Sequence, residues 1–363
     1  MTRGLHADYG AEFETRGGRD VVAHYGRPDR THLAVRNGVG VIEMGYGVVV
    51  VEGPDAVDYV DNAVSNRVPD ADGEGCYALL LDPQGGIETD CYVYNAGERL
   101  LCFTPPERAD PLADEWSDKV FIQDVSIRDA SSAFAVFGVH GPSATETLAT
   151  LLAGASVPET EAPLTFVRGS IADAGVTVVS ADDPTGETGY EVVCTADAAE
   201  DVLDSLLTRG SPTTPVGYHT WDTLTLEAGT PLFETELVGR IPNVAGVRNA
   251  LDFEKGCYVG QEVVSRVENQ GRPSERLVGL TLDAVPESGA AVFDGDAAVG
   301  EVTRAAETPS CDRPVALAYV EYGVADDAPD LAVRVDGTDV AATVTDLPFV
   351  EGSGRSARLP RYD

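Results

Sequence analysis

The octapeptide KGCYVGQE, residues 255–262, holds residue types that could carry chemistry in this chain. It contains Lys255, one of only two lysines among 363 residues, and Cys257, which lies between two glycines of the motif. If the segment is extended or a turn, the side chains of Lys255 and Cys257 can project to the same side. A nearby ammonium favours the thiolate, which is the reactive form of cysteine. The pair therefore predicts thiol chemistry at Cys257; the alternative is that Cys257 only packs between domains.

Two carboxylates lie in apolar runs that are typical of strands. Asp90 falls in such a run after the turn residues 82–86, and Glu191 begins another after the glycine-containing residues 185–189. A buried carboxylate is costly unless it is paired or hydrogen-bonded. Glu191 could accept two parallel hydrogen bonds from neighbouring N–H groups of a flat heterocycle. The alternatives are that Asp90 caps the end of a hairpin and that Glu191 is an exposed residue at a strand edge.

Other site classes find little support in the sequence. The six cysteines contain no CxxC pair, and the five histidines are dispersed without HxxxH or HExxH spacing, so we predict no metal site. The run GVGVIEMG (38–45) has no strand–turn–helix unit around it, which argues against a dinucleotide loop. The segment PTGETG (184–189) lacks the GK[ST] ending of a P-loop.

The composition indicates an unusual solvent. The chain has 61 acidic and 25 basic residues, a formal net charge of -36, and is still 43% hydrophobic. Molar salt shortens the Debye length to roughly 3 Å and screens such repulsion. We therefore expect a cytoplasmic protein from a high-salt cytosol, and the acidity argues against a nucleic-acid partner. No apolar run of about 18 residues and no signal-peptide core is present, so we expect no membrane association.

The chain contains an internal repeat near residues 48–116 and 135–207. Each copy begins with a β-branched strand, Gly-Pro and a helix, and later has a strand with Cys and Thr followed by an acidic helix. Such a repeat predicts two related α+β halves. From about residue 276 onward, short strand-like runs broken by Gly, Asp and Pro predict an antiparallel barrel of five or so strands. We therefore expect an α+β protein with a region 1–275 built of two subdomains and a barrel domain 276–363.

Several segments together resemble the glycine-cleavage T-protein superfamily, which contains tetrahydrofolate-binding aminomethyltransferases, related demethylases and YgfZ-type proteins. The octapeptide KGCYVGQE resembles the signature of the YgfZ-type branch. The resemblance covers nearly the whole chain. The other segments that carry it are HYGRPDRTHLAVRNGVGV (24–41), GGIETDCYV (85–93), TGETGYE (185–191), LEAGTPLF (226–233) and GEVTRAAETPSCDRPVALAYV (300–320).

The resemblance implies a fold, a ligand and roles for particular residues. The fold would be a cloverleaf of two ferredoxin-like, folate-binding units and a C-terminal antiparallel β-barrel around a central folate hole. Asp90 would be a catalytic acid that also holds tetrahydrofolate, or a one-carbon derivative of it. Glu191 and Tyr190 would bind the folate, and Lys255 and Cys257 would belong to the characteristic site of the branch.

The sequence also departs from the family pattern. The family's D-V-S-H-M stretch is replaced by EMGYG (43–47), the Tyr before the TGE turn is Pro184, and the Arg of the L-R-L-E-A-G helix is Thr225. These departures predict fewer folate contacts. We therefore expect a YgfZ-type protein that assists iron–sulfur protein assembly or repair by one-carbon or thiol chemistry, with iron–sulfur client proteins as partners. The alternatives are a T-protein-like aminomethyltransferase with a lipoyl carrier partner, a folate-dependent demethylase, and a folate-binding accessory without turnover.

Overall fold

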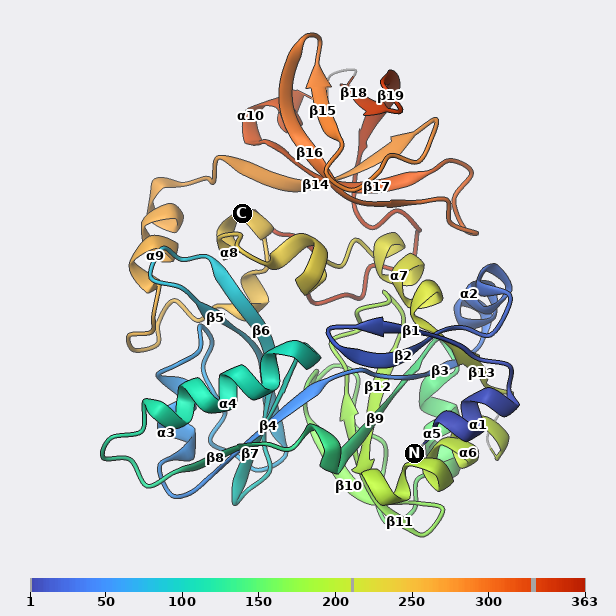
Figure 1. The fold of residues 1–363 in the computed structure, drawn as a ribbon, viewed down its shortest axis with the longest axis vertical. Coiled ribbons are helices and arrows are strands. Elements are labelled where there is room, and N and C mark those ends of the chain that lie inside the picture. Colours follow the sequence, from blue (N-terminus) through green and yellow to red (C-terminus); the bar gives the residue numbers. More distant parts are fainter. Residues whose placement is uncertain (1, 210–211, 328–330, 363) are drawn as a thin grey trace.

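The computed structural model describes residues 2–209, 212–327 and 331–362. Figure 1 shows three lobes: two lobes built on sheets lie side by side, and a barrel lies across their top. A layer of helices separates the barrel from the two sheets (Figure 1). None of the helices in the described part of the chain combines the length and apolar character that a membrane span needs.

The first lobe is a five-stranded sheet with two helices. Its strands lie in the order β5 (Glu74–Leu81), β6 (Ile87–Asn95), β7 (Arg99–Thr104), β4 (Gly47–Glu52) and β8 (Ser126–Asp129). Helices α3 (Ala56–Asp61) and α4 (Ala109–Asp118) bury their apolar side chains against one face of this sheet. Because side chains alternate along each strand, the opposite face presents a second apolar surface toward the molecular centre.

The second lobe repeats this plan with one additional strand, β3. Its strands lie in the order β10 (Phe166–Ile171), β11 (Ala174–Ser180), β12 (Gly189–Thr195), β9 (Phe134–His140), β3 (Gly40–Glu43) and β13 (Thr214–Val216). Helices α5 (Ala144–Leu151) and α6 (Ala199–Thr208) contribute to a separate core behind the sheet. Strand β3 precedes the first lobe in the sequence, yet it pairs with β9 and β13 of the second. This crossover ties the two lobes together.

The C-terminal lobe is a closed barrel. Its strands follow the order β14 (Glu275–Leu282), β17 (Val315–Glu321), β16 (Ala297–Ala306), β15 (Ala291–Asp294), β18 (Leu331–Val335) and β19 (Thr338–Thr345). Pairing of β14 with β19 closes the barrel, so it has six strands rather than the five or so expected. The predicted fold class, two α+β units with an antiparallel barrel, is confirmed.

The remaining elements surround the centre. They are α1 (Arg3–Asp8), β1 (Glu12–Arg16), β2 (Arg19–His24), α2 (Pro28–Asn37), α7 (Tyr218–Glu227), the π-helix η4 (Phe233–Leu237), α8 (Pro242–Ala245), α9 (Gln261–Gln270) and α10 (Tyr322–Asp327). Short 3₁₀ turns are η1 (Pro106–Arg108), η2 (Ser131–Ala133), η3 (Ala196–Ala198) and η5 (Arg248–Ala250). Gly229, two residues after the end of α7, has φ +69°, a backbone conformation that favours glycine.

The chain after β19 returns from the barrel to the centre, where its end lies beside α8 (Figure 1). The N–H of Ala357 donates to the carbonyl of Asp182 at 3.0 Å, and the N–H of Arg361 donates to Gly246 at 2.9 Å. The hydroxyl of Tyr362 accepts a hydrogen bond from the N–H of Leu277 at 2.6 Å. The C-terminal tail is therefore bonded to the second lobe, the helical layer and the barrel.

Candidate active site

A cavity of about 560 Å³ lies where the first sheet, the β1–β2 pair, the helical layer and the barrel meet. Residues of β6, β7, α7, η4, β16 and the C-terminal tail line it. Much of its wall is aromatic, and the rings come from Tyr46, Tyr92, Phe103, Tyr218, Trp221 and Phe233. Such a wall suits a flat heterocyclic ligand that stacks on or packs against rings.

Asp90 lies in the wall of this cavity. Its side chain projects from the middle of β6, and the residue is 9% exposed. The Tyr77 hydroxyl donates to Asp90 Oδ2 at 2.8 Å. Burial raises the pKa of Asp90, while the charge of Arg358 acts in the opposite direction. The predicted buried strand position is found, and it is Asp82 that caps the hairpin turn, by accepting from the N–H groups of Gln84 and Gly86.

Arg358, from the C-terminal tail, is a cavity residue that the sequence reasoning missed. Its guanidinium lies over the rings of Tyr77 and Tyr92, at 5.1 and 5.8 Å from their centroids. Its Nε lies 3.1 Å from Asp182 Oδ2, an ion pair without good hydrogen-bond geometry, and its Nη1 lies 3.9 Å from Asp90 Oδ2. A signal existed: the segment GRSARLPRY (354–362) carries three arginines in a chain that is poor in basic residues.

Glu191 is buried behind the cavity wall. It lies on β12, between β11 and β9, and is 6% exposed, so the strand-edge alternative is wrong. The Tyr46 hydroxyl donates to Glu191 Oε1 at 2.7 Å, whereas Oε2 has no hydrogen-bond partner among the described residues. Burial raises the pKa of Glu191 to about 7, and the charge of Asp182 acts in the same direction. Tyr46 lines the cavity and Glu191 does not.

Tyr190 does not reach the cavity. Successive residues of a strand face opposite sides of the sheet, so Tyr190 points away from the side that Glu191 faces. Its ring is fully buried in the core between the second sheet and helices α5 and α6. Its hydroxyl lies 2.8 Å from Thr145 Oγ1 of α5. The structure thus places Tyr190 in a core and away from the cavity, and its predicted contact with a folate stays a prediction without support from its position.

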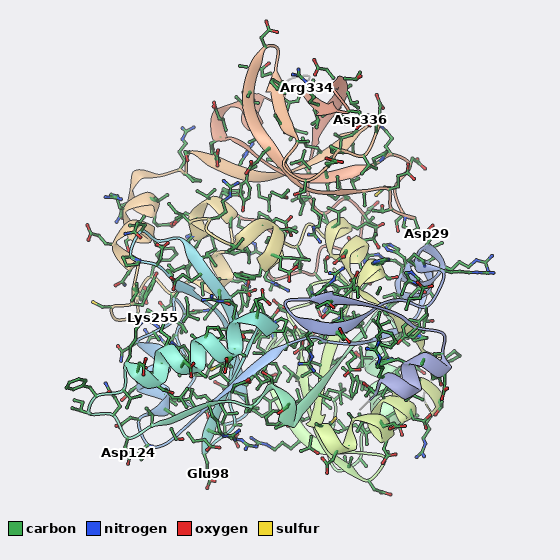
Figure 2. All side chains as sticks on the ribbon, in the orientation of Figure 1. Asp29, Glu98, Asp124, Lys255, Arg334 and Asp336 are labelled. Atoms are coloured by element: carbon green, nitrogen blue, oxygen red, sulfur yellow. The ribbon has the colours of Figure 1, made fainter. Side chains whose placement is uncertain are left out.

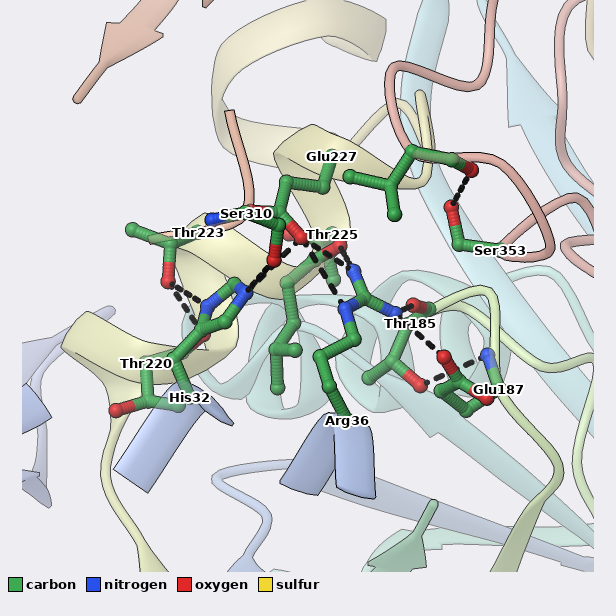
Figure 3. A network of polar contacts seen from close by, with 12 residues as sticks. His32, Arg36, Thr185, Glu187, Thr220, Thr223, Thr225, Glu227, Ser310 and Ser353 are labelled. Carbon is green, nitrogen blue, oxygen red and sulfur yellow. Dashed lines mark hydrogen bonds and ion pairs between the residues drawn. The ribbon is translucent and has the colours of Figure 1, made fainter. Parts of the chain in front are cut away.

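The loop that precedes Glu191 is held by Arg36 of α2 (Figure 3). Arg36 Nη1 donates to the carbonyl of Thr185 at 2.7 Å and to Glu187 Oε1 at 3.1 Å. Its Nη2 donates to Glu227 Oε2 on α7 at 2.9 Å. One guanidinium therefore fixes the TGETG loop to two helices, and the glutamate of LEAG serves as its partner rather than as a ligand contact.

His32 extends this network to the barrel side (Figure 3). Its Nε2 lies 2.9 Å from Glu227 Oε2 and its Nδ1 lies 2.8 Å from Thr223 Oγ1. Ser310, which follows β16, lies 3.3 Å from His32 Nε2 through its hydroxyl. Serine and glutamate both face the same ring nitrogen, so the three residues do not form a catalytic triad. The network connects α2, α7 and the segment that follows β16, and its geometry is that of a structural contact.

Lys255 is buried in a structural contact. Its ammonium donates to the carbonyl oxygens of Asp61, Val64 and Asn66 at 2.5, 2.9 and 2.8 Å, and lies 3.2 Å from Asp61 Oδ1. Asp61 ends helix α3, so a cation satisfies carbonyls where the helix dipole is negative. In Figure 2, Lys255 lies below α9, at the side of the first lobe. Burial lowers the pKa of Lys255, and Asp61 opposes that shift.

After Lys255 the octapeptide is irregular over residues 256–258, turns at residues 259–260 and ends in the first two residues of α9. Gly260 has φ +80°, and a Cβ there would lie 2.7 Å from the carbonyl oxygen of Asp82. The close approach at Gly260 therefore serves the β5–β6 turn. Cys257 is an exposed thiol, and neither it nor Lys255 lines the cavity beside Asp90. A chemical role for Cys257 stays a prediction.

The fold and the cavity define a class: a protein of two related sheets and a barrel that encloses a ligand cavity at the junction of its lobes. Comparison with known families gives this class a name. The GCVT N-terminal domain matches residues 3–255, and the glycine cleavage T-protein C-terminal barrel domain matches residues 275–351. The chain belongs to the glycine cleavage T-protein family.

Individual relatives match this chain over almost their full length. An aminomethyltransferase of Cutibacterium acnes is 31% identical, with 96% of this chain and 97% of that protein covered. A probable aminomethyltransferase of Halobacterium salinarum is 32% identical, with the same coverage. The crystal structure of glycine cleavage system aminomethyltransferase T from Bartonella henselae superposes with a TM-score of 0.84 at 25% identity, covering 96% of this chain and 97% of that one.

These comparisons correct the predicted function. The expected role in iron–sulfur protein assembly or repair is wrong, because the full-length relatives and the solved structure carry the aminomethyltransferase name. The assignment to the YgfZ-type branch rested on the octapeptide 255–262, and no finding supports it. The structure gives a physical account of the octapeptide that needs no chemistry, since Lys255 caps α3 and Gly260 packs on a turn.

Proposed function

We propose that this chain is a folate-dependent transferase of the aminomethyltransferase type, which binds tetrahydrofolate or a one-carbon derivative of it beside Asp90. The observation that carries the proposal is the position of Asp90, a buried carboxylate that lines the central cavity and lies near a buried arginine. The aminomethyltransferase relatives support the same class of reaction.

The lining of the cavity supports the proposal of a reduced folate as ligand. Its aromatic wall offers faces for a pterin ring, and Glu191 Oε2 is a buried acceptor that lacks a donor. Its charged lining is balanced, with three carboxylates against three arginines, namely Asp90, Asp222, Glu234, Arg16, Arg304 and Arg358. A balanced lining matters because the chain as a whole, at -36, would repel the anionic glutamate tail of a folate.

The residues of the chain would orient the ligand and handle a proton. Bound tetrahydrofolate would supply the nitrogen atoms that accept the one-carbon unit. Asp90 would hold those nitrogen atoms in place and exchange a proton with them, a task that its raised pKa favours. Tyr77 and Arg358 would fix the Asp90 carboxylate in one orientation. Under this proposal the aminomethyl donor is the lipoyl arm of a carrier protein.

The test is the release of ammonia from an aminomethyl-lipoyl carrier protein in the presence of tetrahydrofolate, in high KCl. We expect release by the unaltered protein and a rate about 10²–10⁴ times lower for Asp90→Asn. Glu88→Gln is the matched control, because Glu88 is an exposed carboxylate on the same strand. Binding of tetrahydrofolate without ammonia release would indicate a folate-binding accessory protein, and absence of binding would refute the proposal.

A further inference from the structure

Tyr46 separates the central cavity from Glu191. One side of Tyr46 lines the cavity, and its hydroxyl donates to Glu191 Oε1 at 2.7 Å. Glu191 itself is 6% exposed and does not line the cavity. Tyr46 is therefore a cavity-lining residue whose hydroxyl already occupies one oxygen of this carboxylate.

The side chain of Tyr46 is held in that position by its neighbours. Its ring packs edge-on against Tyr92, with centroids 6.2 Å apart, and lies 5.7 Å from the ring of Phe103. On the main chain, Arg19 Nη1 donates to the carbonyl of Tyr46 at 2.6 Å. The contact with Glu191 thus belongs to a packed arrangement of aromatic rings between the two sheets.

In this arrangement one carboxylate oxygen of Glu191 has a hydrogen-bond donor and the other has none among the described residues. Its Oε2 is buried without a hydrogen-bond partner among the described residues, and so is Oδ2 of the neighbouring Asp182, apart from its ion pair with Arg358. Buried carboxylate oxygens without donors cost free energy and are uncommon in folded proteins. The bare oxygen is an acceptor that a ligand with N–H donors would satisfy.

We propose that Tyr46 sets the affinity and selectivity of this site by competing with the ligand for Glu191. A carboxylate recognises two adjacent N–H donors best when both of its oxygens are free. Here one oxygen is covered by the Tyr46 hydroxyl, so a pterin-type head group must displace that hydroxyl before both oxygens can bind it. The inference rests on the proposed function, because the head group is that of a folate.

Tyr46→Phe tests the inference by removing the hydroxyl and keeping the ring. We expect tetrahydrofolate to bind about tenfold more tightly in calorimetric titration, because the ligand no longer displaces a charge-assisted hydrogen bond. We also expect the ligand-free variant to melt at a lower temperature, because Glu191 loses its partner. Tyr94→Phe is the matched control, since its ring lies in the same cluster without a hydrogen bond to Glu191.

A double variant assigns the effect to the pair. In the Glu191→Gln background, Tyr46→Phe should no longer change the affinity, because the competing charge is gone. Unchanged or weaker binding by Tyr46→Phe alone would overturn the inference and would leave the proposed function standing. Pterin as a second probe separates the two claims: tighter pterin binding by Tyr46→Phe without tetrahydrofolate binding would refute the proposed function alone. If neither tetrahydrofolate nor pterin bound to the unaltered protein or to Tyr46→Phe, the inference and the proposed function would both be overturned.

Discussion

Arg358 of the C-terminal tail lies 3.9 Å from Asp90 of the first sheet, and it places a buried cation beside the buried carboxylate of the cavity. Its neighbours are a second buried carboxylate, Asp182, and the faces of Tyr77 and Tyr92. The tail therefore contributes a charged group to the candidate site in addition to its bonds with the second lobe, the helical layer and the barrel.

Arg358→Met should destabilise the protein by about 3–5 kcal/mol, because Asp90 and Asp182 would lose their buried cation. The pKa of Asp90 should rise further, since Arg358 is the group that opposes the effect of burial. In an activity assay the acid limb of the pH profile would then move to higher pH. Arg361→Met, at an exposed position of the same tail, should change the free energy of unfolding by less than about 0.5 kcal/mol. Equal effects of the two substitutions in urea unfolding would contradict this account.

Glu191 should make stability fall as pH rises. Its pKa is about 7 in the folded protein against 4.5 for the unperturbed group, so the native state holds this proton to higher pH than the unfolded chain does. The resulting stability is fully present below about pH 4.5 and is lost through pH 7, by on the order of 3 kcal/mol. Urea unfolding at several pH values should show a smaller loss for Glu191→Gln. A parallel pH dependence in both proteins would show that Glu191 does not ionise in this range.

The two lysines of the chain should differ sharply in their contribution to the free energy of unfolding. Lys255→Met should cost about 3 kcal/mol, because it leaves three backbone carbonyls near the end of α3 without their donor. Lys119→Met should cost less than about 0.5 kcal/mol, because Lys119 is exposed and its ion pair is with Glu115, one helical turn earlier. Chemical denaturation of both variants measures the difference. A Lys255→Met variant as stable as Lys119→Met would remove the capping role.

Alanine substitutions of Gly256 and Gly260, the glycines before and after Cys257, should also differ in their effect on stability. Gly260→Ala should cost at least about 2 kcal/mol, because φ is +80° there and the new Cβ would lie 2.7 Å from the carbonyl oxygen of Asp82. Gly256→Ala meets no atom within 4 Å and should be tolerated. Melting temperatures of the two variants test the comparison, which fails if Gly256→Ala is the more damaging substitution.

Salt should stabilise the protein strongly. Acidic residues such as Asp29, Glu98, Asp124 and Asp336 lie at the periphery of the molecule (Figure 2), within a net charge of -36. Their mutual repulsion is long-ranged at roughly 0.1 M salt and is screened as KCl approaches molar concentration. The melting temperature should therefore climb steeply with KCl. A melting curve that does not respond to KCl would refute this explanation of the composition.

The sequence by itself determined the local structure and the chemical character of two buried positions. Apolar runs that follow glycine-containing turns predicted the strands that carry Asp90 and Glu191, because apolar character and turn preferences are local properties of the chain. The internal repeat also predicted two related α+β halves, and the short strand-like runs after about residue 276 predicted the barrel. At Lys255 the scarcity of lysine suggested chemistry, and the structure shows a buried ammonium that donates to backbone carbonyls at the end of α3.

Only the tertiary structure decided which distant side chains meet. Tyr46 contacts Glu191, and Arg358 lies beside Asp90, because the paths of β3 and of the C-terminal tail bring separate lobes together. Strand alternation puts Tyr190 and its neighbour Glu191 on opposite sides of the sheet, but only the packing of the lobes decides that the helices cover the side of Tyr190 and that the cavity lies beyond the side of Glu191. No local pattern encodes these contacts, since each depends on the path of the whole chain between its two partners.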